Sequence, residues 1–201
     1  LDGDNIYGGT FDGTNHTNIG NDTVDYSYIT GSQAITADLS LTAEQIKDRV
    51  TTTNFDTLYD IENVLATKNA DTLKGSDDFT IVNILDGYKG NDTFYASKGL
   101  DSFIGGEGID TLDYSNLTSS NNLTLNLSVA ATNLFVGSSV NDAWQVTISG
   151  GGDSDIVKGI ENIISGAGND IIFADSNSNT IEGGAGADTE SGGGGIDTIY
   201  G

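Results

Sequence analysis

The chain has 201 residues, which is enough for one or two domains and for a sizeable buried core. It contains 28 Gly and no Pro, Cys or Met, and 30 acidic residues against 7 Lys and Arg give a formal net charge of −23. The lack of cysteine excludes disulfides, thiol catalysis and cysteine metal sites. Because so acidic a surface repels phosphate groups, we expect no nucleic-acid partner and no electrostatic docking on anionic membranes.

The sequence contains no run of about 18 apolar residues and no basic segment followed by an apolar one, so we expect no membrane insertion. Its acidic residues are mainly short, with 24 Asp and 6 Glu. Asp favours turns and coordinates hard cations, whereas uncompensated negative charge opposes compaction. We therefore expect a cation to complete the fold.

Residues 1–27 read as partial copies of a nonapeptide repeat that becomes regular further along the chain. GNDTVDYS at 20–27 parallels GIDTLDYS at 108–115, with an offset of 88. This parallel places Asp22 in the position of Asp110 and makes it a candidate ligand.

Residues 28–60 are predicted to form a spacer. Alternating apolar residues at 35–41 predict a strand with one buried face. Residues 42–50 offer a Thr42/Gln45 capping box and apolar residues at helical spacing, which predicts a short helix.

Residues 61–113 are predicted to form the first repeat block. From residue 87 to residue 113 they read GYKGNDTFY, ASKGLDSFI and GGEGIDTLD, with Gly fourth, Asp sixth and an apolar residue eighth. Residues 78–86 keep the sixth and eighth positions but lose the glycines. The candidate ligand residues of this block are Asp71, Asn83, Gly87, Gly90, Asp92, Gly99, Asp101, Gly105, Gly106, Gly108 and Asp110.

Residues 114–149 are predicted to form a second spacer, with a strand where Leu alternates at 123–127 and a loop at 128–143. Residues 150–201 follow as the second repeat block, in which GGGDSDIVK and four nonapeptides from residue 165 keep the same frame. Glu190 departs from the pattern because it occupies an apolar eighth position. The candidate ligand residues of this block are Asp155, Gly166, Gly168, Asp170, Asn179, Gly183, Gly184, Gly186, Asp188, Gly193, Gly195 and Asp197.

A longer repeat lies above the short one. IENVLATKNADTL at 61–73 parallels IENIISGAGNDII at 160–172, with an offset of 99. The chain therefore reads as about two copies of one unit. Because it opens and closes inside repeats, we interpret it as a segment of a longer protein.

Each nonapeptide reads as a glycine turn followed by a very short strand with one inward side chain. Such strands are stable only when stacked in parallel, so the chain predicts an all-β parallel β-roll, or β-solenoid, with irregular spacers. If two nonapeptides make one coil, residues 18 apart lie on the same edge, and Asp92 faces Asp110. Two such carboxylates repel by roughly 1–4 kcal/mol. Ca²⁺, which accepts six to eight oxygens in flexible geometry, suits these turns better than Mg²⁺. About eight ions would offset most of the charge.

GGEGIDTLD and GGGGIDTIY match GGxGxDxUx, with U apolar, and so resemble RTX (repeats-in-toxin, or hemolysin-type) calcium-binding repeats. The resemblance implies a parallel β-roll, several Ca²⁺ ions in the turns, and type I secretion from a Gram-negative bacterium. It also implies folding on calcium outside the cell, and a secreted or cell-surface location.

Catalysis has little support, since His16 is the single histidine and no cysteine is present. We expect a non-enzymatic module. The leading function is a calcium-binding structural or extender module of a large secreted adhesin or exoprotein. The alternatives are an accessory module of a secreted protease, lipase or alginate epimerase, or a carbohydrate-binding module. The expected partners are calcium, neighbouring domains of the same chain and, for the last alternative, cell-surface glycans.

Overall fold

The computed structural model describes residues 5–7, 10–11, 16–17, 20–41, 46–48, 55–127, 144–149 and 154–201. Throughout these ranges the backbone forms strands, turns and bends, and it forms no helix. Correspondingly, no described helix is long and apolar enough to cross a membrane.

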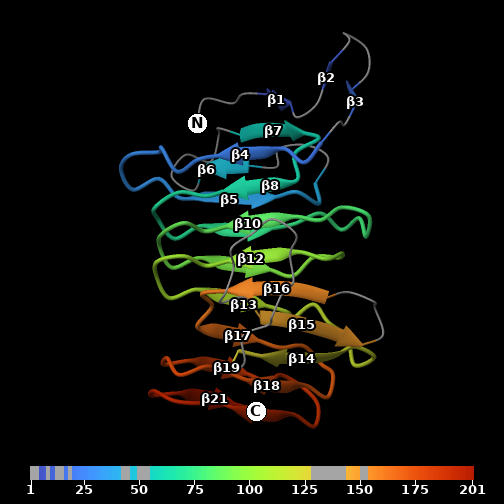
Figure 1. Cartoon of the computed structure of the whole chain (residues 1–201), viewed down its shortest axis with the longest axis vertical. Coiled ribbons are helices and arrows are strands. Elements are labelled where there is room, and N and C mark those ends of the chain that lie inside the picture. Colours follow the sequence, from blue (N-terminus) through green and yellow to red (C-terminus); the bar gives the residue numbers. More distant parts are fainter. Residues whose placement is uncertain are drawn as a thin grey trace.

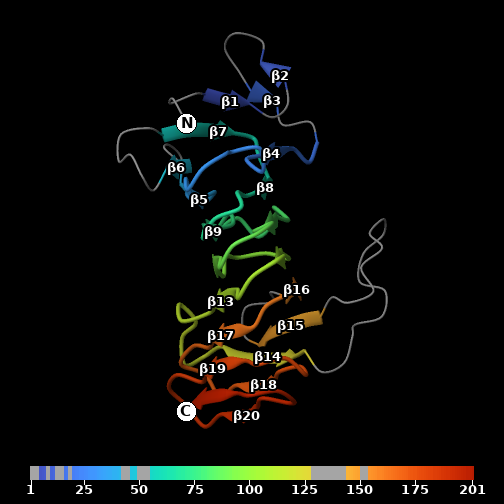
Figure 2. The ribbon, with the colours of Figure 1, turned by 90° about the vertical axis from the view of Figure 1, so that its left-hand side faces the viewer.

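The strands stack into two walls of a flat roll, which runs from the N-terminal to the C-terminal end in Figures 1 and 2. In spatial order, the 10-stranded wall contains β1 (Asn5–Tyr7), β7 (Phe55–Tyr59), β6 (Ile46–Asp48), β5 (Ile35–Asp38), β9 (Thr72–Lys74), β11 (Thr93–Tyr95), β13 (Thr111–Asp113), β17 (Asn162–Ile164), β19 (Thr180–Glu182) and β21 (Thr198–Tyr200).

The 9-stranded wall contains β20 (Thr189–Ser191), β18 (Ile171–Phe173), β14 (Asn122–Asn126), β15 (Trp144–Ser149), β16 (Ser154–Lys158), β12 (Ser102–Ile104), β10 (Ile84–Asp86), β8 (Asn63–Leu65) and β4 (Thr23–Asp25). A separate antiparallel pair joins β2 (Thr10–Phe11) and β3 (His16–Thr17). The all-β parallel roll predicted from the sequence is confirmed.

Strand pairing follows the predicted 18-residue coil within the repeat blocks. β11 pairs in parallel with β13 so that Phe94 lies opposite Leu112, and β10 pairs with β12 so that Leu85 lies opposite Phe103. Two nonapeptides therefore make one turn of the roll, one strand in each wall. This register brings every sixth-position residue beside its counterpart in the next coil.

The core is a thin layer of eighth-position side chains between the walls. The two aromatic members, Phe94 and Phe103, meet edge to face with ring centroids 5.9 Å apart. Fully buried members of the layer are Leu73, Leu85, Phe94, Phe103, Leu112, Ile163, Ile172 and Ile181. Ile199 lies in the last strand of its wall and is 44% exposed.

The predicted helix over residues 42–50 is wrong where the structure describes the segment. Ile46–Asp48 form β6, which pairs antiparallel with β5 on one side and β7 on the other. The ladder between these strands satisfies backbone groups on both sides, and this tertiary pairing outweighs the local helix preference. Residues 42–45 and 49–50 lie outside the described part, as does the loop predicted at 128–143. The strand predicted at 123–127 is confirmed as β14.

The two copies of the long repeat insert their spacer strands into opposite walls. In the first copy, antiparallel β5, β6 and β7 extend the 10-stranded wall, and in the second copy antiparallel β14, β15 and β16 extend the 9-stranded wall. The tripeptide DYS occurs at 25–27 and at 113–115, and each time its tyrosine is buried and hydrogen-bonded to a buried Asp: Tyr26 to Asp56, and Tyr114 to Asp155, at 2.7 Å each. The long repeat is thus a structural repeat with exchanged walls.

Turns join the walls along the two edges of the roll. We call edge 1 the edge whose turns lead into the 10-stranded wall, on the left in Figure 1, and edge 2 the edge whose turns lead into the 9-stranded wall, on the right. Since the walls alternate along the chain, successive turns of a repeat block fall on opposite edges. Each edge therefore carries its own row of sixth-position residues.

Candidate metal centre

A ladder of carboxylates runs along edge 1. Asp92 Oδ1 accepts the backbone N–H of Asp71 at 2.7 Å, and Asp110 Oδ1 accepts that of Asp92 at 2.8 Å. Glu161 Oε2 continues the row by accepting the N–H of Asp110 at 2.8 Å. In the second block, Asp197 Oδ1 accepts the N–H of Asn179 at 3.0 Å. Each carboxylate is thereby fixed against the backbone of the preceding coil.

Edge 2 carries an equivalent ladder. Asp101 Oδ1 accepts the N–H of Asn83 at 2.9 Å, and Asp155 Oδ1 accepts that of Asp101 at 3.0 Å. In the second block, Asp188 Oδ1 accepts the N–H of Asp170 at 2.9 Å. The juxtaposition of sixth-position residues 18 apart, predicted from the sequence, is present on both edges.

Two carboxylates on edge 1 keep a buried oxygen that has no hydrogen-bond partner. These are Asp92 and Asp110, whose Oδ2 atoms are both buried and unpartnered while the residues are 1% and 0% exposed. Desolvation raises the pKa of Asp92 to about 8. The hydrogen bond from the Asp71 N–H lowers this pKa, while the nearby carboxylates of Asp71, Asp110 and Asp86 raise it. Desolvation also raises the pKa of Asp110 to about 6, and the nearby carboxylate of Glu161 acts in the same direction. A bound cation would favour the charged form of both groups.

Backbone carbonyls converge on the same two oxygens. A Cβ added at Gly87 would collide with Asp92 Oδ2 and lie 2.8 Å from the Gly105 carbonyl oxygen. A Cβ added at Gly105 would collide with Asp110 Oδ2 and with the Gly159 carbonyl oxygen. First-position glycines thus leave a cradle lined by one carboxylate oxygen and a carbonyl oxygen of the following coil.

Second-position residues shape the turn in a different way. Gly106 has a φ of +102°, a left-handed conformation that favours glycine, and a Cβ there would collide with the Tyr88 carbonyl oxygen. Tyr88 holds the same position with a φ of +65°. Because Gly87 and Gly105 are not in this region, first-position glycines supply space and second-position residues supply the turn.

These donors fit calcium. In the described part of the chain, no three His, Cys, Asp or Glu side chains gather as a metal-binding group, so a metal here would take its ligands largely from the backbone. Ca²⁺ accepts carbonyl and carboxylate oxygens together, in flexible geometry and without a third carboxylate. The best candidates to hold it are Asp92 and Asp110, together with carbonyl oxygens of the glycine turns.

The remaining acidic and amide candidates fall into two groups. Asp22 Oδ2 and Asn179 Oδ1 are also buried without a partner. In the other group, Oδ2 of each carboxylate already accepts a hydrogen bond within the protein. The members of this group are Asp71, Asp101, Asp155 and Asp170. Asn83 is likewise satisfied, since its Oδ1 accepts the N–H of Ser76 and its Nδ2 donates to the Glu62 carbonyl.

The candidate glycines lie in the turns of both blocks. Those at positions with positive φ are Gly90, Gly99, Gly106, Gly108, Gly184, Gly186, Gly193 and Gly195. Those at which an added Cβ would nevertheless meet a close neighbour are Gly87, Gly105, Gly166, Gly168 and Gly183. Asp188 and Asp197 are partly exposed beside them in the last coils.

Several residues of the ladders are not anticipated by the nonapeptide pattern. Glu62 Oε2 accepts the N–H of Asp22 just as Glu161 Oε2 accepts that of Asp110, both at 2.8 Å. The repeated IEN tripeptide is the sequence signal that could have identified them. Glu190 faces inward opposite Ile172, as its position predicts, and keeps Oε1 buried without a partner; desolvation with nearby Asp188 and Asp170 raises its pKa.

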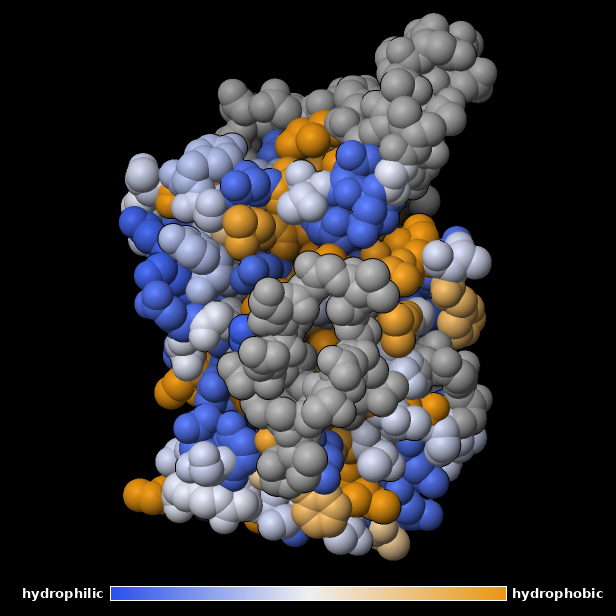
Figure 3. Space-filling model, in the orientation of Figure 1, coloured by the Kyte–Doolittle hydropathy of each residue, from blue (hydrophilic) through white to orange (hydrophobic). Residues whose placement is uncertain are grey.

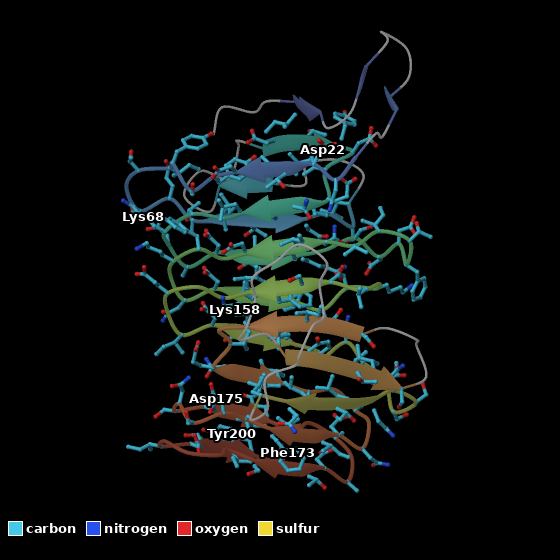
Figure 4. The ribbon with its side chains drawn as sticks, in the orientation of Figure 1. Asp22, Lys68, Lys158, Phe173, Asp175 and Tyr200 are labelled. Atoms are coloured by element: carbon cyan, nitrogen blue, oxygen red, sulfur yellow. The ribbon has the colours of Figure 1, made fainter. Side chains whose placement is uncertain are left out.

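Edge 1 is mainly hydrophilic on the face that Figure 3 shows, whereas apolar residues are visible toward both ends of the stack. Figure 4 places Lys68 and Asp175 on edge 1 and Asp22 toward edge 2. Among the described residues, two ion pairs lie in the first block: Lys89 with Glu107 across neighbouring coils, at 2.7 Å, and Lys74 with Asp77, at 3.0 Å. These features surround the turns but do not enter the buried ladders.

The fold and the turns define a class: a parallel β-roll whose glycine turns present carboxylate and carbonyl oxygens to a cation. Comparison with known families agrees, because the RTX calcium-binding nonapeptide repeat (4 copies) matches residues 82–112 and 158–190. These stretches are RTX repeats, and the chain contains a calcium-binding β-roll module. Repeats of this kind are typically structural and typically extracellular. No curated protein matches the chain.

Proposed function

We propose that the chain is a structural or extender module of a large secreted adhesin or exoprotein, and that it folds when it meets calcium outside the cell. The observation that carries this proposal is the pair of buried, unpartnered Oδ2 atoms of Asp92 and Asp110 in a chain of net charge −23. A buried carboxylate without compensation is costly, so the roll is incomplete without a cation.

The two oxygens of each of these carboxylates have different roles. Oδ1 of Asp92 and of Asp110 holds the backbone of the preceding coil, while Oδ2 and the glycine carbonyls face the space between coils. Calcium supplies the positive charge that neutralises this oxygen-rich space. Where calcium is scarce, repulsion along the ladder opposes folding, and where it is plentiful the coils stack. This coupling suits a protein that is exported unfolded by a type I system.

Neighbouring domains of the same chain are the partners that an extender requires. An aromatic ring that stacks on a sugar must be accessible, whereas Tyr26 and Tyr114 are buried and hydrogen-bonded to Asp56 and Asp155. They therefore give no support to carbohydrate binding. No described feature favours a catalytic role over the structural one.

Far-UV circular dichroism in EGTA, followed by titration with Ca²⁺ and separately with Mg²⁺, tests the proposal. We expect a cooperative gain of β structure with Ca²⁺ that Mg²⁺ does not reproduce. Full β structure in EGTA, unchanged by Ca²⁺, would reduce the Asp rows to turn chemistry and overturn the proposal.

A further inference from the structure

We infer that calcium serves only part of the roll, because side-chain hydroxyl groups replace it at four of the ladder carboxylates. This inference rests on the proposed calcium-dependent function and specifies which carboxylates take part in it. We call Asp92 and Asp110 the open carboxylates, and Asp71, Asp101, Asp155 and Asp170 the capped carboxylates.

In both groups, Oδ1 of each carboxylate accepts a backbone N–H. Oδ1 of open Asp92 accepts the N–H of Asp71, and Oδ1 of capped Asp101 accepts the N–H of Asn83. Backbone position and burial also agree, since Asp92 and Asp101 are 1% and 0% exposed. Asp92 and Asp101 differ at Oδ2, which has no partner in Asp92 and accepts the Ser97 hydroxyl in Asp101.

Each capped carboxylate receives a hydroxyl on that second oxygen. Asp71 Oδ2 accepts both the N–H and the hydroxyl of Thr67, at 2.7 and 2.9 Å. The other donors are the hydroxyls of Ser97 to Asp101 at 2.6 Å, Tyr114 to Asp155 at 2.7 Å, and Ser165 to Asp170. A hydroxyl donor stabilises an ionised carboxylate without a metal.

Over the coils that carry Asp92 and Asp110, the capping separates the two edges. Along edge 2, Asp101 and Asp155 are capped and Asn83 has both amide atoms bonded within the protein. Along edge 1, Asp92 and Asp110 are open. In these coils calcium therefore binds on edge 1, at Asp92 and Asp110, and protein groups hold edge 2, whereas Asp71, one coil earlier on edge 1, is capped by Thr67.

The assignment recurs between the two copies of the long repeat, which supports it independently. Asp71 and Asp170 are equivalent at the offset of 99, and both are capped. Asp22 and Asp110 are equivalent at the offset of 88, and both keep Oδ2 unpartnered. The copies lie in exchanged walls, so the match follows the sequence unit rather than the wall or the edge.

The test compares Asp92→Asn with Asp71→Asn, neighbours on the edge 1 ladder. Each variant is dialysed to equilibrium in excess Ca²⁺ and its bound calcium is counted by elemental analysis. The melting temperature is then measured in two media, one with saturating Ca²⁺ and one with the lowest Ca²⁺ that gives a transition. We expect Asp92→Asn to lose at least one ion per chain. Asp71→Asn should retain the full count and lose stability by a similar amount in both media. Equal loss of ions in the two variants would overturn the inference.

A second pair keeps the inference falsifiable if Asp71→Asn does not fold. Thr67→Ser retains the hydroxyl and Thr67→Ala removes it. We expect Thr67→Ala to lower the melting temperature by a similar amount at saturating Ca²⁺ and at the lowest Ca²⁺ that gives a transition, with Thr67→Ser close to the parent. If calcium abolishes the loss in Thr67→Ala, the ion can occupy this turn and the inference fails. A parent chain that binds no calcium would instead contradict the proposed function itself.

Discussion

Two neighbouring turns of edge 1 occupy equivalent positions in the fold, but only one of them satisfies its carboxylate with protein groups. The turn at 66–71 has Ala and Thr in its first two positions, and Thr67 donates twice to Asp71 Oδ2. The turn at 87–92 has Gly87 and Tyr88 there, and Asp92 Oδ2 is left buried without a partner. The difference teaches that the residues opening a nonapeptide, more than the shared Asp, decide whether the turn needs an ion.

The largest effect should come from the core that both kinds of turn share. Phe103→Ala removes a fully buried ring that packs on Phe94, and we expect it to lower the free energy of unfolding by about 3–5 kcal/mol. Urea titration at saturating Ca²⁺ measures this. Ile109→Ala, at a site 56% exposed, is the control and should change little. A small effect at Phe103 would mean that the ions, rather than the core, dominate stability.

Strain in an open turn should come next. Gly106→Ala forces a side chain into a φ of +102° and against the Tyr88 carbonyl, which we expect to cost about 2–4 kcal/mol and to raise the calcium midpoint. Chemical denaturation and a calcium titration followed by circular dichroism measure the two quantities. Gly194→Ala is the matched control, since its φ is not positive and its nearest neighbours lie at 3.3–3.6 Å. Equal costs at the two glycines would contradict the stacked-turn geometry.

Removal of a capping hydroxyl should have a moderate effect. Tyr114→Phe deprives Asp155 Oδ2 of its donor in the core, and we expect a loss of about 1–3 kcal/mol. The loss should not depend on calcium concentration, because a protein group satisfies this carboxylate. Thermal unfolding over a range of Ca²⁺ checks this, with Tyr95→Phe, 42% exposed, as the control. A loss that vanishes at high Ca²⁺ would remove the contrast between the two groups.

Acid should partly replace calcium, as the smallest of the four effects. In the metal-free folded chain, burial raises the pKa of Asp92 to about 8 from its ordinary value of 3.8. The folded state therefore binds more protons than the unfolded state between these values, and its stability falls as pH rises through them. We expect the metal-free chain to have more β structure near pH 5 than near pH 8. Bound calcium should reverse the trend, because it requires the ionised form. Circular dichroism across pH, in EGTA and in Ca²⁺, measures both trends. β structure that increases with pH in EGTA would contradict the prediction.

The repeat pattern predicts much of the architecture because each nonapeptide carries its own turn, ligand and inward side chain. The 18-residue coil, the buried eighth positions and the facing of Asp92 and Asp110 all follow from that local code. The short helix does not, since pairing with β5 and β7 makes Ile46–Asp48 a strand. Capping by Tyr114 could not be predicted either, because its partner Asp155 is 41 residues away. Long-range contacts of this kind have no signature in a nonapeptide.

The parallel stacking has a mechanical consequence. A coil of 18 residues adds one strand spacing to the length of the roll, about 4.8 Å, whereas the same residues pulled straight span about 60 Å. Each coil that unravels under tension therefore releases roughly twelve times the length that it occupied when stacked. Ions that bridge successive turns would set the force at which this release begins, so that a tether built from such rolls would stay short and stiff in calcium and become long and slack without it.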